Sequence, residues 1–333
     1  MPFPNLPTEI LEAIASKLDE FSLKSLLECC PHLTALMPLL DAAILESQKH
    51  PNRRISALHW AAEKGFRKLA SILLANGASI NVRDGCNQTP LHHAVLGDNE
   101  LMAQFLLSHP DIDISAHDDA WQTAFHCAAL SGRVGMVMIF LDHGVEINQG
   151  TYQAKQTALH FAVQFGNLAV AELLLRRGAD IDRRCERGKT ALHWAAQGNH
   201  VFNRDLVPGI SLLIENGADV TVQDQMGNTA LHVLAQCYLE GAYDAITLLL
   251  EHGAGIDVQN KKGKTALHVA ALDDSGRDSP DVLNLLLDEG ADIGIKDSRG
   301  LTALETAVKR GFRFTRRNRN ECEIGFRGSI FPM

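Results

Sequence analysis

The chain has 333 residues, a formal net charge of −9 at pH 7, 46% hydrophobic residues and only 6% aromatic residues. This length allows two domains, and the shortage of aromatic residues suits helices that pack through small side chains. No apolar run approaches the roughly 18 residues of a membrane span, and acidic Glu9 and Glu12 stand where a secretory signal would be basic. An acidic chain also argues against general nucleic-acid binding. We therefore expect neither a membrane nor a nucleic acid among its partners.

The seven cysteines are scattered along the chain without a Cys-x-x-Cys pair. An odd number of unpatterned cysteines is typical of a reduced protein rather than of a disulfide scaffold. We therefore expect the chain in the cytoplasm, in the nucleus or in both.

Residues 1–50 predict three short helices. In the first, Pro7 stands at a natural helix start, and apolar side chains follow at helical spacing: Leu6, Ile10, Leu11, Ile14 and Leu18. Further apolar segments cover 23–29 and 33–45. This pattern resembles the F-box, the three-helix motif by which substrate receptors dock onto the Skp-type adaptor of cullin-based ubiquitin ligases. The resemblance implies that Pro7 and the five apolar side chains contact such an adaptor.

A second interpretation of residues 1–50 is an N-terminal cap. Terminal units of a repeat array need a polar outer face, and a short helical segment can supply one. A cap that descends from an F-box but no longer binds the adaptor is a third interpretation.

Residues 51–311 carry a recurring tetrapeptide of the form Thr-Ala-Leu-His. Its copies begin at Ser56, Thr89, Thr123, Thr157, Thr190, Thr229 and Thr265. An eighth copy begins at Thr302 and carries Glu305 in place of the histidine. The steps of 33 to 39 residues between copies identify an array of about eight repeats, the last one incomplete.

Each copy predicts two short helices. The leading hydroxyl can cap a first helix, a glycine then breaks the chain, and an apolar pair followed by glycine ends a second helix. The pattern resembles the ankyrin repeat. This resemblance implies an all-α solenoid of helix-turn-helix repeats joined by short β-hairpin loops, with proteins as its ligands.

The hairpins between repeats are the first candidate binding surface. Two aromatic residues, Trp121 and Tyr152, fall near the predicted tips, and we expect the Trp121 ring to lie largely in water. Later tips are basic: Arg187, Lys189, Lys261, Lys262, Lys264 and Arg299. One interpretation is an acidic partner segment that lies along these tips with an apolar anchor on Trp121. The other is a solvated charged edge with no binding role.

The loops between the two helices of repeats five to seven are a second candidate surface. Their extra residues lie at 198–209, 236–243 and 273–280. Insertions on one face of a solenoid often mark a binding face, but long surface loops are also tolerated without function.

The sequence predicts no catalytic site, metal site or cofactor. Seven histidines occupy the same position in successive repeats, which hydrogen bonding within the array explains, and the common metal, phosphate-loop and nucleophile motifs do not occur. The predicted function is that of a non-enzymatic adaptor, monomeric outside its complex. Its repeats would hold a protein substrate of unknown identity for a Skp- and cullin-based ligase. The alternative is an ankyrin scaffold without a role in ubiquitination.

Two further features are local. Asn81 and Asn148 lie at the hairpin position that some ankyrin proteins have hydroxylated, although asparagine there is also a good turn former. Residues 312–333 form a basic segment in which we expect a disordered tail.

Overall fold

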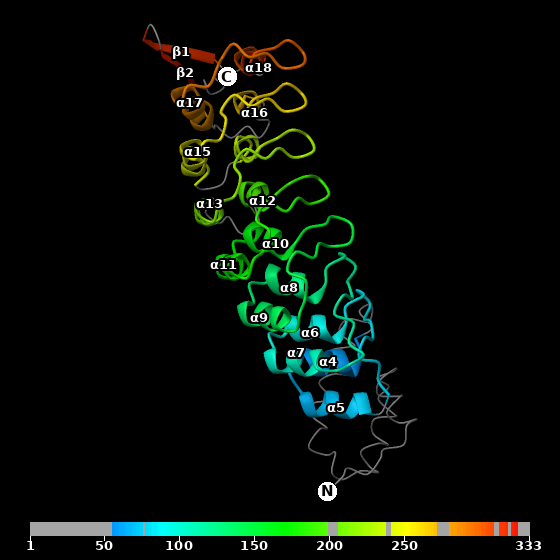
Figure 1. The fold of residues 1–333 in the computed structure, drawn as a ribbon. Coiled ribbons are helices and arrows are strands. Elements are labelled where there is room, and N and C mark those ends of the chain that lie inside the picture. The colour runs from blue at the N-terminus through cyan, green and yellow to red at the C-terminus, as the bar shows by residue number, and fades with distance from the viewer. Residues whose placement is uncertain are drawn as a thin grey trace, which may run out of the picture. The chain divides into compact units, whose positions relative to one another are not determined.

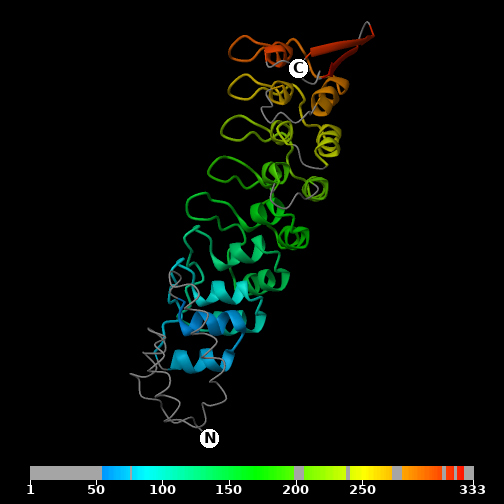
Figure 2. The ribbon, with the colours of Figure 1, turned by 180° about the vertical axis from the view of Figure 1, so that it is seen from behind.

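The computed structural model describes residues 55–75, 77–198, 206–237, 241–271, 280–309, 313–318 and 321–325. The chain divides into two compact units, Met1–Gln153 (unit 1) and Ala154–Met333 (unit 2). Figure 1 shows the ribbon and Figure 2 the same ribbon from behind. Each unit is described by itself.

The described part of unit 1, from residue 55 onward, contains three pairs of helices. The first helix of each pair packs on its second helix, and first helices of neighbouring pairs also pack together. The pairs are α4 (Ala57–Lys64) with α5 (Arg67–Ala75), α6 (Pro90–Leu96) with α7 (Glu100–Leu107), and α8 (Ala124–Leu130) with α9 (Val134–Asp142).

Unit 2 continues the same arrangement. Its first helices are α10 (Ala158–Gln164), α12 (Ala191–Gln197), α14 (Ala230–Leu234), α16 (Ala266–Ala270) and α18 (Ala303–Lys309). Its second helices are α11 (Leu168–Arg176), α13 (Val207–Glu215), α15 (Ala242–Glu251) and α17 (Pro280–Asp288). In both ribbon views, the first helices of this unit form one row and the second helices another, and the long loops project from the row of first helices. Unit 2 therefore has a loop side and a second-helix side.

Each first helix begins at the tetrapeptide because the cap residue and the histidine satisfy each other. The backbone N–H of Thr157 donates to Nδ1 of His160 at 3.0 Å, and the Thr157 hydroxyl oxygen lies 2.7 Å from the same nitrogen. Since Nδ1 accepts, the proton is on Nε2, which donates to the carbonyl of Lys189 at 3.3 Å. That carbonyl belongs to the next repeat, so one histidine both starts a helix and joins two repeats.

The same contacts occur along both units. The ring Nε2 reaches a carbonyl of the following hairpin at 2.9 to 3.2 Å in six further cases: His59, His92, His126, His193, His232 and His268. These histidines are at most 2% exposed. The prediction that hydrogen bonding within and between repeats explains the repeated histidine is confirmed.

The last tetrapeptide carries Glu305, and its carboxylate replaces the imidazole. Oε2 of Glu305 accepts from the backbone N–H of Thr302 at 2.8 Å, and the N–H of Glu305 donates to Oγ1 of Thr302 at 3.2 Å. These two bonds form a reciprocal capping box at the start of α18. From 303 to 325, the described residues contain no second helix after α18, as the incomplete eighth repeat predicts.

The second helices mostly end as predicted. Six closing glycines have φ between +79° and +91°, a left-handed conformation that favours glycine: Gly77, Gly144, Gly178, Gly217, Gly253 and Gly290. Helix α7 differs, as expected, because it is followed by Ser108 in a right-handed conformation. The core of each unit is built from small residues, with Ala61, Ala128 and Ala162 fully buried, so neighbouring helices approach closely.

The C-terminal segment differs from the prediction. Strands β1 (Arg313–Asn318) and β2 (Glu321–Gly325) pair antiparallel, with Phe314 opposite Ile324, and β2 lies beside α17. The expectation of a disordered tail is therefore wrong for these residues. Phe314 and Ile324 are residue types that favour β-strands. The repeats themselves are all-helical.

Several predictions concern residues outside the described ranges. These are the F-box-like residues Leu6, Pro7, Ile10, Leu11, Ile14 and Leu18, and most of the lengthened loops at 198–209, 236–243 and 273–280. Within the described part of the chain, no helix has the length and apolar character needed to cross a membrane.

Candidate functional site

Each regular hairpin tip is organised by an aspartate or asparagine that the sequence analysis did not identify. In unit 2, Oδ1 of Asp224 accepts from the backbone N–H groups of Met226 and Asn228, both at 2.8 Å. Such an Asx turn fixes the tip without help from a partner. Equivalent pairs of bonds form at four other tips: at Asp84, Asp118, Asn260 and Asp297. The signal was present, because these residues recur at a constant distance ahead of the cap threonine.

Backbone hydrogen bonds join successive tips of unit 2. The N–H of Gln225 donates to Arg187 O, that of Lys261 to Met226 O, and that of Ser298 to Lys262 O, all at 3.0 Å. The side chains on these tips therefore project from a connected platform rather than from independent loops.

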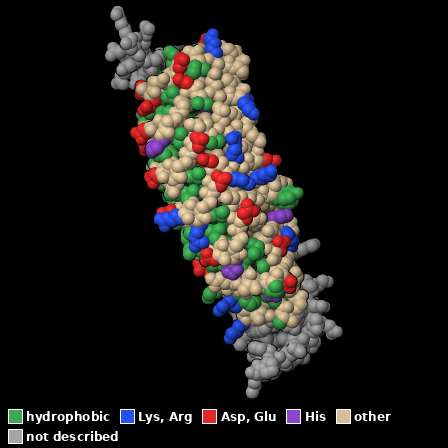
Figure 3. All heavy atoms as spheres, in the orientation of Figure 1, with side chains coloured by type: hydrophobic (Ala, Val, Ile, Leu, Met, Phe, Trp, Pro, Cys, Tyr) green, Lys and Arg blue, Asp and Glu red, His purple; other side chains and the backbone are tan. Residues whose placement is uncertain are grey.

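The basic tip residues differ in exposure and in whether a carboxylate pairs with them. Arg187, Lys261 and Lys262 are exposed, as predicted. Arg299 is also exposed, but its guanidinium pairs with the buried carboxylate of Asp297 at 3.0 Å, so much of its charge is neutralised locally. Figure 3 shows that Lys and Arg side chains gather along the loop side of unit 2, whereas Asp and Glu gather on its second-helix side.

The negative charge of the second-helix side comes from carboxylates on or next to its helices. Six exposed carboxylates lie on or directly after the second helices of unit 2: Glu172, Glu215, Asp244, Glu251, Asp288 and Glu289. Unit 2 thus separates its exposed charge, with a basic loop side and an acidic helix side.

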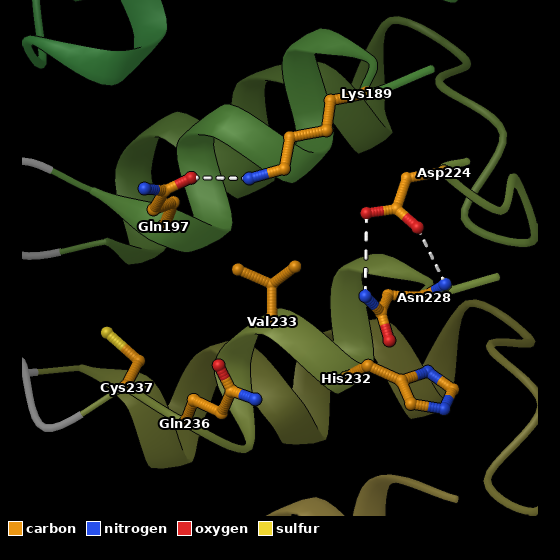
Figure 4. A pocket seen from close by; sticks show the side chains of 8 residues that line it. All are labelled: Lys189, Gln197, Asp224, Asn228, His232, Val233, Gln236 and Cys237. Atoms are coloured by element: carbon orange, nitrogen blue, oxygen red, sulfur yellow. Dashed lines mark hydrogen bonds between the residues drawn. The ribbon is translucent and has the colours of Figure 1, made fainter. Parts of the chain in front are cut away.

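Lys189 is not a tip residue, which corrects the sequence prediction. Its side chain runs back along α12, where Nζ donates to Oε1 of Gln197 at 2.7 Å and lies 5.0 Å from the ring centroid of Trp194 (Figure 4). The side chain is half-buried, and burial lowers the pKa of its ammonium, an effect that the carboxylate of Asp224 partly offsets. The Trp194 ring and the Gln197 amide position the Lys189 ammonium beside α12. The spacing of residues in the sequence did not predict this position.

Lys189 lies at the edge of a cavity between the fifth and sixth repeats. The cavity has a volume of about 250 Å³, and Val233 projects into the space between α12 and α14 (Figure 4). Its lining residues are Lys189, Gln197, Asp224, Asn228, His232, Val233, Gln236 and Cys237.

A second hollow of about 120 Å³ adjoins the first. It is lined by Met226, Asn228, Gln236, Asn260, Lys262, Lys264 and Val269. Asn228 and Gln236 line both hollows, so the two are neighbours along repeats five to seven. We call the two hollows together the Asn228 groove. Lys264, predicted as an exposed tip, instead is half-buried in its wall.

The aromatic tip residues of unit 1 lie against each other. The Trp121 ring stacks on Tyr152 with centroids 4.9 Å apart, and it contacts the ring of His117 in a tilted arrangement at 4.5 Å. Trp121 is therefore half-buried, and the expectation of a ring largely in water is wrong because its neighbours cover it. Tyr152, by contrast, is 73% exposed. Trp121 also has φ of +61°, which is strained for a bulky side chain.

Unit 1 also contains a buried charged cluster. Nε2 of His93 lies 3.0 Å from Oδ2 of Asp84, and its Nδ1 lies 3.5 Å from Oε2 of Glu63, an ion-pair distance rather than a short hydrogen bond. Burial lowers the pKa of His93, but the two carboxylates outweigh it and raise that pKa overall. The contact with His93 is the main cause that lowers the pKa of Glu63 to about 2. This cluster joins α4, α6 and the hairpin between them.

Asn81 is a bridge between hairpins of unit 1. Its Nδ2 donates to Asp111 O at 2.7 Å, and its Oδ1 accepts from the N–H of Asp113 at 2.9 Å. Within the described ranges, no group of three or more His, Cys, Asp or Glu residues is placed to hold a metal ion.

The repeat geometry is matched by a family model described as ankyrin repeats, over residues 14–118, 116–185, 150–207, 177–260 and 234–316. This chain belongs to the ankyrin repeat family. The first match begins at residue 14 and so overlaps the segment predicted to be F-box-like.

Two solved ankyrin repeat domains are similar in structure. The human ASB11 ankyrin repeat domain aligns with a TM-score of 0.58 and 26% identity, covering 72% of this chain and 99% of that domain. The ankyrin repeat domain of Bcl-3, titled a unique member of the IkappaB protein family, aligns with a TM-score of 0.56 and 27% identity, over 70% of this chain and 98% of that domain.

Curated relatives match over short segments. Mouse Rabankyrin-5 is 38% identical over 58 residues, which is 17% of this chain and 5% of that protein. The NF-kappa-B inhibitor cactus of Drosophila melanogaster is 44% identical over 66 residues, 20% of this chain and 13% of that protein. This chain therefore spans only a small part of these relatives. Together the comparisons indicate a protein-protein interaction scaffold.

Proposed function

We propose that this ankyrin repeat chain is a non-catalytic binding protein that holds a partner protein on the loop side of unit 2. The Asn228 groove carries the proposal, because its two neighbouring hollows are flanked by tips that backbone hydrogen bonds hold in place. A preformed groove binds a flexible segment without first having to order its own walls.

The buried histidines support a binding role rather than catalysis. His160 is committed to Thr157 and to the carbonyl of Lys189, and the equivalent residues are used in the same way. A general base needs an accessible nitrogen within reach of its substrate. These rings instead hold adjacent repeats together.

The finer proposal is that residues 1–50 attach the chain to a Skp-type adaptor of a cullin ubiquitin ligase. It is supported by the Leu6-Pro7 opening and the helical spacing of Ile10 and Ile14. In this view the repeats select the substrate in the cytoplasm or nucleus, and the N-terminal segment delivers it to the ligase.

Affinity purification of the full chain, followed by mass spectrometry, tests both the binding of a partner by the repeats and the binding of an adaptor by residues 1–50. A Leu6→Ala/Pro7→Ala double variant should lose the adaptor and the cullin but keep the repeat-bound partner and its thermal unfolding midpoint. If the double variant keeps the adaptor, or if no adaptor accompanies the parent chain, the ligase proposal is wrong. The chain would then be a scaffold without a role in ubiquitination.

A further inference from the structure

We infer that the Asn228 groove binds an extended acidic segment of a partner protein, with carboxylate side chains six residues apart meeting the lysines of repeats five and seven. This inference rests on the proposed binding function and adds the chemistry and spacing of the ligand. It places a carboxylate in each of the two hollows of unit 2.

The first hollow offers a partly desolvated cation. Nζ of Lys189 has one hydrogen bond, to Gln197, and burial lowers its pKa, so the charged form gains from an added anion. The only carboxylate in the lining is Asp224, which is buried and whose Oδ1 already accepts two backbone N–H groups. Asp224 therefore shapes the tip while leaving Lys189 able to receive a carboxylate from a ligand.

The second hollow combines positive charge with apolar surface. Lys262 and Lys264 lie on its walls, and Val269 and Met226 supply aliphatic contact, with Met226 50% exposed. A glutamate matches this lining, because its methylene groups can pack on Met226 while its carboxylate reaches a lysine. A nucleic acid matches it less well, because the described lining contains no Phe, Tyr or Trp side chain on which a base could stack, and the ring of His232 is buried.

The repeat spacing sets the spacing of the ligand. Packed helices lie about 8 to 10 Å apart, so equivalent positions of neighbouring repeats are separated by about this distance. An extended polyproline II segment rises about 3.1 Å per residue and places every third side chain on one side, about 9 Å apart. Lys189 and Lys264 directly precede the cap threonines of repeats five and seven, and Asn228 has this position in repeat six. The two lysines are therefore two repeats apart, about 16 to 20 Å, and acidic residues six positions apart, about 19 Å in polyproline II, would meet them in register.

The charge separation of unit 2 orients such a ligand. Exposed cations Arg187 and Lys261 lie on the loop side, whereas carboxylates such as Glu215 and Glu251 lie on the second-helix side. An acidic segment is attracted to the first side and repelled by the second.

The test measures fluorescence anisotropy of a labelled proline-rich peptide with glutamates six residues apart, titrated with the full chain. The comparison peptide has the same composition with its glutamates in one block, and a labelled single-stranded oligonucleotide tests for general attraction to polyanions. We expect the spaced peptide to bind about tenfold more tightly than either comparison ligand. Equal binding of the blocked peptide or of the oligonucleotide would overturn the inference.

Variants locate the site. Lys189→Met should weaken the spaced peptide about tenfold, and Lys262→Met should weaken it less because that side chain is more exposed. The matched control is Arg177→Gln, which removes a cation from the second-helix side of the same unit and should leave binding unchanged. Thermal unfolding midpoints of all variants show whether the fold is kept. Equal affinity of Lys189→Met and the parent, at an unchanged midpoint, would also overturn the inference.

The failure of this inference is distinguishable from that of the proposed function. If the purified partner still binds the Lys189→Met and Lys262→Met variants while the spaced peptide binds none of the chains, the chain is a binding protein that uses another surface. If no partner binds at all, the proposed function itself is wrong.

Discussion

The ring of Trp121 stacks on that of Tyr152 with an interplanar angle of 26° and a centroid separation of 4.9 Å, although the two residues belong to consecutive hairpins of unit 1. Stacked aromatic pairs contribute about 0.5 to 1.5 kcal/mol beyond their buried area. This contact also offsets the strain of the positive φ at Trp121.

We therefore predict that Trp121 and Tyr152 are coupled in stability. In a double-mutant cycle with Trp121→Ala and Tyr152→Ala, urea unfolding should give an interaction free energy of about 1 kcal/mol. The pair Trp121→Ala and Leu101→Ala is the control, because Leu101 is an exposed residue on another element of the same unit. Additive effects of Trp121→Ala and Tyr152→Ala would mean that the stack does not hold the two hairpins together.

The capping histidines predict a loss of stability in acid. Burial lowers the pKa of His160 from 6.5 to about 4. Its contribution is fully present above about pH 6.5, where the unfolded chain is also neutral, and is lost as the pH falls towards 4. A shift of this size corresponds to at most about 3 kcal/mol.

The variant His160→Gln separates this titration from the cap. Glutamine can keep the capping box but has no proton to gain. We expect the variant to be less stable than the parent near pH 7 and to lose less free energy of unfolding between about pH 6.5 and pH 4.5. If parent and variant lose stability in parallel over this range, another group is responsible.

For His93 we predict the opposite dependence of stability on pH. Its folded pKa is raised, so its stabilising charge is fully present below its unfolded pKa and is lost as the pH rises through the folded value. The groups that face it are Asp84, Glu63 and His59. Burial lowers the pKa of His59 to about 4.

An NMR titration of the imidazoles checks this contrast. His93 should remain protonated at a pH at which His59, with its ring centroid 4.8 Å away, is already neutral. Asp84→Asn removes the nearer carboxylate and should lower the midpoint of His93. A midpoint of His93 below that of a histidine in an unfolded peptide would contradict the ion-pair account.

The final repeat predicts an effect confined to the end of the array. Glu305→Ala removes the carboxylate that accepts from the N–H of Thr302, a loss of about 0.5 to 2 kcal/mol for a helix cap. Hydrogen exchange should accelerate in α18 and leave α10 unchanged, because a repeat contacts only its neighbours. Equal acceleration in both helices would show that the array unfolds as a single cooperative block.

The sequence was sufficient to predict the repeats because their determinants are local. The spacing of threonine and histidine located each first helix, and glycine located most ends of second helices. The Asx turns at Asp224 and its equivalents could also have been predicted, because they depend on a side chain and the backbone two and four residues later.

The candidate site was predicted less well because it depends on contacts between elements. In the sequence, Lys189 has the position of a tip residue. Only the fold shows that its side chain contacts Gln197 and Trp194. The Asn228 groove requires three consecutive repeats, and its polar lining has no distinctive sequence pattern. The strands β1 and β2 arise in a segment whose arginines suggested a tail.

Hydrogen-deuterium exchange of the full chain, with and without its captured partner, tests the central claim most directly. We predict that the partner slows exchange at residues 186–190, 224–237 and 260–265, which line or flank the Asn228 groove, and leaves the second helices α11 and α13 unchanged. Lys189→Met should strongly reduce this protection at a partner concentration close to the dissociation constant of the parent. Protection confined to the second helices or to unit 1, with the groove residues unaffected, would contradict the account.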